Sequence, residues 1–263
     1  MEPVNHDRAS NGRVIAGLQL RAMKQGLLHD LLTRGIDANG DLRPSQAEAP
    51  HLYKETPLGW LPKEWDALPL GDYTQHEITY GIVQAGPHID GGIPYVRTGD
   101  MSGDALVPET MLCTSERIAR SYRRSEVRAG ELVIAIRATL GKVLPVPENL
   151  DGANLTQGTA RISPKPSVNA SSLMWAIRHQ RGQDMIMKEI KGSTFMEISL
   201  GALRKVLIAL PLQRDEQNKI ANRLAGNEPA IGAERMMLDK LRLQKSGLMD
   251  DLLTGHVSVS PLL

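Results

Sequence analysis

The sequence predicts an α+β protein in which one mixed α/β domain is flanked by two long helices that form a coiled-coil-like antiparallel spacer. Three observations support this fold class. Two copies of one helical segment lie near the two ends of the chain, a turn-rich stretch follows the first copy, and short β-branched runs fill the middle. The expected segments are an N-terminal helical segment at 1–35, a linker at 36–57, a mixed domain at 58–210, a helix at 211–256 and a tail at 257–263.

The helical repeat is visible by direct alignment. Residues 20–33 align without gaps to residues 241–254, and nine of the fourteen positions are identical. The identities include a glycine, an aspartate and a threonine as well as leucines, which is more than two unrelated leucine-rich helices would share. Self-similarity of this kind indicates a repeated structural unit.

Each copy of the repeat has the spacing of a helix with a narrow apolar stripe. In the second copy, leucine and isoleucine recur three, four and seven residues apart between Ile220 and Leu252. A narrow stripe suits packing against another long helix. Lys24 and Lys245 interrupt the stripe at equivalent positions, where a lysine either fixes the register or extends to solvent. The residues expected on the spacer surface are Leu20, Lys24, Leu27, Leu31, Leu238, Leu241, Lys245, Leu248 and Leu252.

Breaks in the pattern set the expected boundaries. Pro229 should kink or break the C-terminal helix near its start. Residues 36–60 contain three prolines together with Asp37, Asn39, Gly40 and Gly59 and show little periodicity, which predicts a turn-rich linker at 36–57. Trp60 and Trp65 follow it and mark the start of a packed domain.

The middle of the chain has the pattern of short strands with one helix. β-Branched runs predict strands at 93–96, 131–136 and 206–210. One helix is expected from about 171 to 189, with its apolar residues on one side.

Composition limits the class of protein. The 263 residues are 41% hydrophobic and 23% charged, which is ordinary for a soluble globular protein. The small number of aromatic residues argues against a single-strand binder built on stacking platforms. Cys113 is the only cysteine, which excludes an internal disulfide and suits a reducing cytoplasm. Because no stretch of 18 apolar residues exists, we expect a cytoplasmic protein that does not associate with membranes.

Positive charge is concentrated in one stretch although the net charge is only +1. Five arginines fall within twelve residues, namely Arg117, Arg120, Arg123, Arg124 and Arg128. Such a run forms either a solvated face or an edge that contacts phosphates.

The sequence contains no recognisable catalytic machinery. It has neither a phosphate loop nor a dinucleotide fingerprint, and its histidines are not spaced to bind a metal. Asp184, Glu189 and Lys191 are the residue types of a magnesium-dependent nuclease, but they fall at the end of one predicted helix rather than on a rigid strand-and-turn framework. We therefore expect no catalytic residue, no bound metal and no directly bound cofactor.

Three stretches resemble one known family. Residues 24–37 resemble the central helical region of type I restriction–modification specificity subunits. Residues 57–65, Pro-Leu-Gly-Trp-Leu-Pro-Lys-Glu-Trp, resemble the opening of their target-recognition domains, and residues 211–221 resemble the start of their conserved helix. Strands at 130–141 and 152–158 are similar as well, so that the resemblance covers nearly the whole chain from about residue 13.

The resemblance implies a non-catalytic DNA-specificity subunit that takes part in phage defence. In this family, two recognition domains each bind one half of a bipartite double-stranded DNA target, and two antiparallel helices set the gap between the halves. Methyltransferase subunits dock on these helices and restriction/motor subunits join through the complex, so that S-adenosylmethionine, ATP and Mg²⁺ are expected on the partner subunits.

This chain departs from the family plan because it holds a single target-recognition domain, residues 58–210. It resembles a half-length form, which would act as a homodimer or pair with another half-subunit. A twofold dimer would recognise a gapped palindrome. Two alternatives remain, namely the recognition fragment of a fused restriction–methyltransferase enzyme and a truncated or silent cassette that acts only in assembly.

The expected DNA contacts lie in loops that contain glycine, because the main chain can approach DNA closely there. Arginine and lysine suit guanine edges or phosphates, asparagine and glutamine suit adenine, and serine and threonine suit phosphates. For any one of these residues, the alternative role is to satisfy the backbone of a turn. The candidates are Thr79, Tyr80, Gln84, Arg97, Thr98, Asp100, Arg137, Thr139, Lys142, Asn154, Thr156, Gln157, Lys191, Ser193 and Thr194.

Overall fold

Two strands at the opposite ends of the mixed domain pair with each other. In the computed structural model, which describes residues 26–190 and 196–226, β3 (Trp65–Pro69) runs antiparallel to β11 (Leu207–Pro211) over five residue pairs. Trp65 at the start of β3 is almost fully buried. The pairing brings the two ends of the domain side by side.

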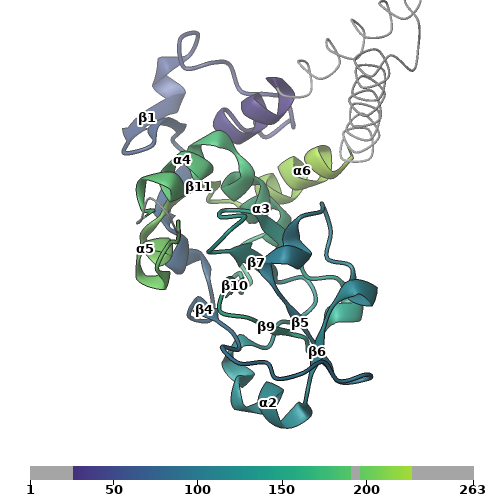
Figure 1. Cartoon of the computed structure of the whole chain (residues 1–263). Coiled ribbons are helices and arrows are strands. Elements are labelled where there is room, and N and C mark those ends of the chain that lie inside the picture. Colours follow the sequence, from purple (N-terminus) through teal and green to yellow (C-terminus); the bar gives the residue numbers. More distant parts are fainter. Residues whose placement is uncertain (1–25, 191–195, 227–263) are drawn as a thin grey trace, which may run out of the picture. The chain divides into compact units, whose positions relative to one another are not determined.

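Two larger sheets fill the domain between these ends (Figure 1). The first has four antiparallel strands in the order β4-β10-β7-β8, and the second has the order β6-β5-β9, with β5 and β9 parallel. Their bounds are β4 (Thr79–Tyr80), β5 (Ile93–Val96), β6 (Cys113–Thr114), β7 (Leu132–Ala135), β8 (Val143–Pro145), β9 (Asn154–Leu155) and β10 (Thr159–Ile162). The three strands predicted from β-branched runs are therefore confirmed as β5, β7 and β11.

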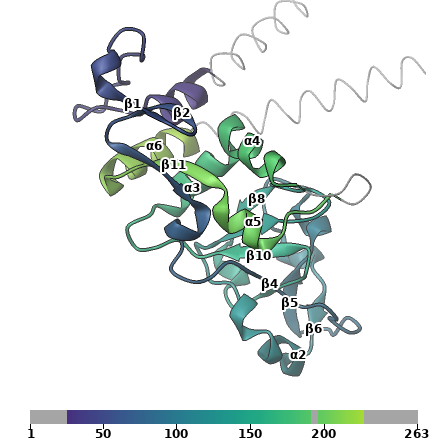
Figure 2. The same cartoon turned by 90° about the vertical axis from the view of Figure 1, so that its left-hand side faces the viewer.

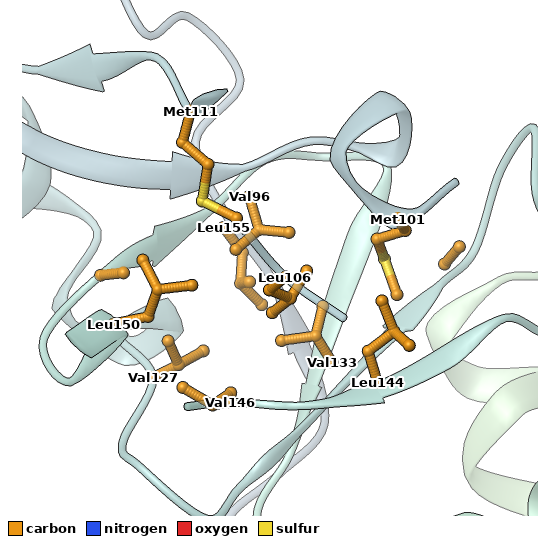
Figure 3. Close-up of a cluster of buried hydrophobic side chains, with 12 residues drawn as sticks. Val96, Met101, Leu106, Met111, Val127, Val133, Leu144, Val146, Leu150 and Leu155 are labelled. Carbon is orange, nitrogen blue, oxygen red and sulfur yellow. The ribbon is translucent and has the colours of Figure 1, made fainter. Parts of the chain in front are cut away.

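A hydrophobic cluster joins the two sheets (Figure 3). Every residue of β7 is buried, and Val133 meets Leu144 of β8 and Val96 of β5 within this cluster. The other members come mainly from the connecting segments, such as Met101 and Leu150. The burial of these loop residues holds the irregular connections against the sheets.

Short helices occupy the connections. The α-helices are α2 (Glu116–Ser121), α3 (Ala170–Arg178), α4 (Gln180–Lys188), α5 (Leu200–Lys205) and α6 (Arg214–Ala225). The 3₁₀ turns are η1 (Pro50–Leu52), η2 (Leu70–Tyr73), η3 (Thr98–Met101), η4 (Pro108–Thr110), η5 (Arg123–Ser125) and η6 (Glu148–Leu150). In both Figure 1 and Figure 2, α2, β5 and β6 lie at one end of the domain, away from β11 and α4.

The single helix predicted from 171 to 189 is wrong, because the chain forms α3 and α4 with a break at His179. His179 has an extended backbone, and its side chain accepts a hydrogen bond from Arg181 N at the start of α4. Gly182 of α4 lies so close to the end of α3 that a Cβ would be 2.4 Å from the carbonyl oxygen of Ala176. This close approach of the two helices replaces a continuous helical turn.

The stretch 36–57 is structured, which corrects its prediction as a linker. Ile36 is buried and pairs with Leu42, and β1 (Tyr53–Thr56) forms a hairpin with β2 (Gly59–Pro62). The hairpin crosses the expected boundary at residue 58. Contacts define one compact unit, His29–Ala221, which includes the whole stretch.

A buried carboxylate joins this stretch to the start of α6. Glu216 accepts hydrogen bonds from Arg43 Nη1 at 2.5 Å, from Trp65 Nε1 at 3.0 Å and from the Ile36 amide at 3.1 Å. Gly35 has φ of +64°, and a Cβ there would lie 2.4 Å from Glu216 Oε1. We call Gly35, Ile36, Arg43, Trp65 and Glu216 the Glu216 hub.

Most of the predicted spacer surface lies outside the described residues. Residues 26–33 form a helix in which Leu27 is half-buried and Leu31 is fully buried, and α6 is described to its end. The positions outside the described part are Leu20, Lys24, Pro229, Leu238, Leu241, Lys245, Leu248 and Leu252.

Within residues 26–190 and 196–226, none of the helices combines the length and the hydropathy needed to cross a bilayer.

Candidate nucleic-acid interface

Four of the predicted contact residues meet around one open groove of about 370 Å³. They are Thr98 in η3, Arg137 after β7, and Thr156 and Gln157 between β9 and β10. The segment after β4 forms the opposite part of the lining. We call this the recognition groove, and its lining residues are Ile82, Val83, Ala85, Tyr95, Thr98, Arg137, Thr156, Gln157 and Gly158.

A glycine lets the segment after β4 approach the loop before β10. A Cβ on Gly81 would lie 1.8 Å from the carbonyl oxygen of Leu155, so only glycine fits at this position. The backbone N–H of Ile82 donates to the same carbonyl at 2.6 Å, and the backbone N–H of Gln157 donates to the carbonyl oxygen of Ile82 at 3.1 Å. These bonds fix one wall of the groove against the other.

A second glycine shapes the floor. A Cβ on Gly158 would lie 2.8 Å from Thr98 Cγ2. The backbone of the loop between β9 and β10 therefore packs directly against the side chain of Thr98 in η3. The Thr156 hydroxyl donates to the carbonyl of Val96 at 3.1 Å, which ties the loop to β5. Thr156 therefore holds the groove in shape through its hydroxyl, while the exposed side chain of Gln157 is left available.

The groove presents the groups needed to contact base edges. Gln157 offers an amide that suits adenine, and Thr98 offers a hydroxyl. The Arg137 guanidinium donates to Glu197 Oε2 at 2.8 Å, and both side chains of this ion pair are about half-exposed. Such an exposed pair is weak and can exchange its carboxylate for a guanine edge or a phosphate.

Sequence reasoning missed the apolar part of the lining. Ile82 and Tyr95 are buried beneath the groove, while Val83 is 51% exposed. Nothing in the sequence signals this role, because the exposure of Val83 is visible only in the folded domain. An apolar side chain in this position suits the methyl group of thymine.

Arg97 and Asp100 lie beside the groove but brace its wall. The Arg97 guanidinium donates to Asp100 Oδ1 at 2.7 Å and to Oδ2 at 3.1 Å, and the Arg97 amide donates to Oδ2 at 2.8 Å. The hydrogen bond that Arg97 donates to Asp100 raises the pKa of Arg97. The Asp100 side chain is only 5% exposed, so this pair primarily caps η3.

The prediction of Asn154 as a DNA contact is wrong. Its side chain is 1% exposed, and its Oδ1 accepts from the Ser125 hydroxyl at 2.6 Å and from the Leu155 amide at 2.9 Å. Its Nδ2 donates to the carbonyl of Ala119 at 3.2 Å. Asn154 joins α2, η5 and β9 inside the domain and is not available to a ligand.

The remaining candidates are spread over neighbouring segments. Thr79 and Tyr80 form β4, Tyr80 is 38% exposed, and Gln84 is exposed beside the groove. Thr139 is exposed in the turn after β7, and Lys142 pairs with Asp104 at 3.3 Å. These five are not brought into the groove lining, and their role in DNA contact stays a prediction. Lys191, Ser193 and Thr194 lie outside the described residues.

The arginine run divides into paired and unpaired residues. Arg120 pairs with Glu116 within α2, and Arg128 pairs with Glu126 at 2.8 Å. The exposed side chains of Arg123 and Arg124 make neither a hydrogen bond nor an ion pair within the described part of the chain.

The described residues were also searched for a metal centre. Across 26–190 and 196–226, histidine, cysteine, aspartate and glutamate do not gather into any group of three that could hold an ion.

Comparison with known proteins identifies a family for this arrangement. The model of the type I restriction modification DNA specificity domain matches residues 62–226. The specificity subunit of the type I restriction enzyme EcoBI of Escherichia coli is 26% identical over 168 residues, which cover 62% of this chain and 35% of that protein. The putative type I restriction enzyme MjaX specificity subunit of Methanocaldococcus jannaschii is 24% identical over 246 residues, covering 91% of this chain and 52% of that protein.

Solved structures of the same kind share the fold. A chain from a type I restriction–modification system has a TM-score of 0.53 at 20% identity, covering 93% of this chain and 56% of its own length. The HsdS subunit from Thermoanaerobacter tengcongensis has a TM-score of 0.52 at 19% identity, covering 93% of this chain and 55% of its own length. The chain thus spans about half, or less, of the length of the relatives that it matches.

Proposed function

The chain belongs to the family of type I restriction modification DNA specificity domains, and we propose that it supplies sequence recognition to a type I restriction–modification complex. Its single recognition domain binds one half of a bipartite double-stranded DNA target. The chain performs no chemistry itself.

One observation carries this proposal within the family. Thr98, Arg137 and Gln157 lie far apart in the sequence, yet they line one open groove. Their hydroxyl, guanidinium and amide groups are those that discriminate base edges in the major groove. Because glycines at 81 and 158 hold the walls in close contact, these side chains are presented from a rigid frame.

The partners follow from the proposed role. Methyltransferase subunits dock on an antiparallel spacer formed by the repeated helical segments, and restriction/motor subunits join through them. S-adenosylmethionine, ATP and Mg²⁺ belong to those partners. Two recognition domains, contributed by two copies of this chain or by this chain and another half-subunit, together bind the complete target in the cytoplasm.

A methylation map tests the recognition role. The full chain would be expressed with a type I methyltransferase subunit, and modified adenines would be mapped across the host genome. We expect one gapped motif for the native chain. Gln157→Ala should relax or shift one position of that motif, because a good bidentate base contact contributes about 1–3 kcal/mol of discrimination.

The controls separate recognition from folding. Gln180 is an exposed glutamine of α4 that bonds only to Asp184 in its own helix, so Gln180→Ala should leave the motif unchanged. A native chain that directs methylation to no motif would overturn the proposed function. A motif that is identical in the Gln157→Ala variant would remove Gln157 from the interface.

The same map tests the pairing of half-subunits. A palindromic motif with a gap is expected from a twofold dimer of this chain. A motif whose halves differ would show instead that the second half comes from another recognition domain. Light scattering on the purified chain, with and without the methyltransferase subunit, gives the stoichiometry independently.

A further inference from the structure

A second and larger groove, separate in its lining from the recognition groove, is strongly basic. Its volume is about 640 Å³, and it is lined by six cationic side chains but by a single carboxylate, that of Glu131. The whole chain carries a net charge of only +1, so this excess is local. We call it the basic groove, and its cations are Arg123, Arg124, Arg128, Arg161, Lys165 and Arg214.

These cations come from segments that are distant in sequence. Arg123 and Arg124 belong to η5, Arg161 to β10, and Arg214 to the first turn of α6. A solvated helix face would take its charges from one element. Convergence of several elements on one concave surface is the property of a binding site.

Half of the cations are held in place by the protein. Arg161 Nη1 donates to the carbonyl of Glu126 at 2.6 Å, and Arg214 Nη1 donates to the carbonyls of Pro166 and Val168. Arg128 pairs with Glu126 at 2.8 Å and with Asp151 at 3.5 Å. These bonds fix the guanidinium groups along the wall. Arg128 is partly neutralised by its two carboxylates, and Arg161 lies 4.0 Å from Glu131 Oε2, whereas the bonds of Arg214 are to carbonyls.

The other half is available to a ligand. The side chains of Arg123, Arg124 and Lys165 are exposed and have no hydrogen-bonding or ionic partner among the described residues. Arg161 Nε is buried without a hydrogen-bond partner within that part of the chain, because its ionic contact with Glu131 Oε2, at 4.0 Å, is beyond hydrogen-bond distance. A buried donor of this kind is costly unless something binds it.

The N-terminal end of α3 adds positive potential. Ala170, the first residue of α3, lines the basic groove, and the first turn of α3 carries no acidic residue, whereas Asp215 and Glu216 occupy the first turn of α6. The N-terminal end of a helix carries a partial positive charge and favours anions. The end of α3 and the arginines thus favour the same kind of ligand.

We propose that the basic groove binds the phosphate backbone of double-stranded DNA outside the recognition groove and without regard to sequence. Guanidinium groups match phosphate oxygens through paired hydrogen bonds, and an open groove of this size accommodates consecutive phosphates. The proposal rests on the proposed function. It adds a contact that sets affinity and orientation, whereas the recognition groove sets sequence.

The test compares two double variants of the full chain that lose equal charge from the same arginine run. One is Arg123→Ala with Arg124→Ala in the basic groove. The control is Arg117→Ala with Arg120→Ala on α2, which are exposed and do not line that groove. Fluorescence anisotropy would measure binding to a duplex that contains the mapped motif and to a scrambled duplex, over a series of NaCl concentrations.

The salt dependence gives the readout. Each phosphate contact contributes about 0.9 to the slope of log K against log salt concentration, so the groove variant should lose about 1.8 from the slope on both duplexes. The control variant should keep the native slope. The ratio of affinities for the two duplexes should stay at the native value in both variants.

The outcomes separate this proposal from the proposed function. If the groove variant keeps the native slope while the native chain prefers its motif, the basic groove proposal is wrong and the recognition role stands. An equal loss of slope in both variants would also overturn it, since net charge would then explain the effect. The same anisotropy assay would also be run with labelled poly-glutamate. If the groove variant loses binding to poly-glutamate but keeps native binding to both duplexes, the groove accepts an acidic protein segment instead of DNA. A native chain that binds neither duplex would overturn both proposals.

Discussion

Replacement of Glu216 by alanine should destabilise the domain more than any change on its surface. The carboxylate is 8% exposed and accepts from the guanidinium of Arg43, the indole of Trp65 and the amide of Ile36. Alanine removes all of these acceptors at once. Arg43 would then remain as a buried cation. The other carboxylate near it is that of Glu64, which is 3.7 Å away and more than half exposed.

The expected magnitude follows from these contacts. Loss of one partner of a buried ion pair costs about 3–5 kcal/mol. The indole and amide donors add about 1–3 kcal/mol each where water cannot reach them. We expect a total of at least about 5 kcal/mol, the lower end of the sum, which is comparable with the whole stability of many domains, at about 5–15 kcal/mol.

Urea unfolding followed by tryptophan fluorescence measures this loss, since Trp65 belongs to the hub. The midpoint should fall while the slope with urea stays constant. If the alanine variant does not fold, Glu216→Gln gives a smaller loss, because it keeps one oxygen acceptor but loses the charge. Asp215→Ala is the neighbouring control. Asp215 is 76% exposed and pairs only with Lys219, so its loss should stay below about 1 kcal/mol.

The reasoning would be refuted if Glu216→Ala cost no more than Asp215→Ala. A combined Arg43→Met and Glu216→Met variant gives a further check. Because an apolar pair removes the unmatched charge, this variant should be more stable than Glu216→Ala alone.

Two further predictions concern the groove and pH. Gly81→Ala should cost about 1–3 kcal/mol in urea unfolding and weaken binding to the motif, because a Cβ would collide with the carbonyl of Leu155. Gly99→Ala, where a Cβ meets nothing within 4 Å, should cost under about 1 kcal/mol, and equal losses would contradict the argument. Burial, followed by the charges of His29 and Arg181, lowers the pKa of His179 to about 4. As pH falls, His179 therefore takes up its proton in the unfolded chain before it does so in the folded one. About 3 kcal/mol of folding stability, fully present above pH 6.5, should be lost as pH falls to about 4. His179→Asn, which keeps a capping side chain, should flatten unfolding curves over this range, and an unchanged pH dependence would exclude His179 as the cause.

The elements that the sequence predicts well are those with a strong local pattern. The strand around Val133 is a continuous β-branched run between breakers, and all of its residues are buried. Of the two tryptophans predicted to enter the packed domain, Trp65 is buried with a bonded indole, whereas Trp60 is 44% exposed. At Val133 and Trp65 the local pattern and the tertiary environment agree.

The errors lie where tertiary contacts decide the local structure. Neither glycine nor proline marks the break at His179, which depends on the approach of Gly182 to α3. The stretch before Tyr53 has the composition of a linker, but it folds because Glu216 and Arg43 bind it from far along the chain. Such contacts leave no periodic signal in the sequence.

The candidate site shows the same division. Four candidates from glycine-containing loops line one groove, since Gly81 and Gly158 permit its close packing, and their contact with DNA stays a prediction. Residue type alone could not separate Gln157, which is exposed, from Asn154, which is buried three positions earlier. The sequence also marked Arg123 and Arg124 but not Arg161, because the strand that carries Arg161 joins them only in the folded domain.

The Glu216 hub has a consequence for how this protein can be re-engineered. Arg43 and Glu216 are 173 residues apart in sequence but share two hydrogen bonds. The chain therefore leaves and returns at nearly the same point, as an insertion does in a host protein. A segment grafted between these two residues could keep the Arg43–Glu216 hydrogen bonds, but it would also have to supply the indole donor that Trp65 directs at the same carboxylate. The design of such an exchange would then depend on one junction rather than on the whole surface of the domain.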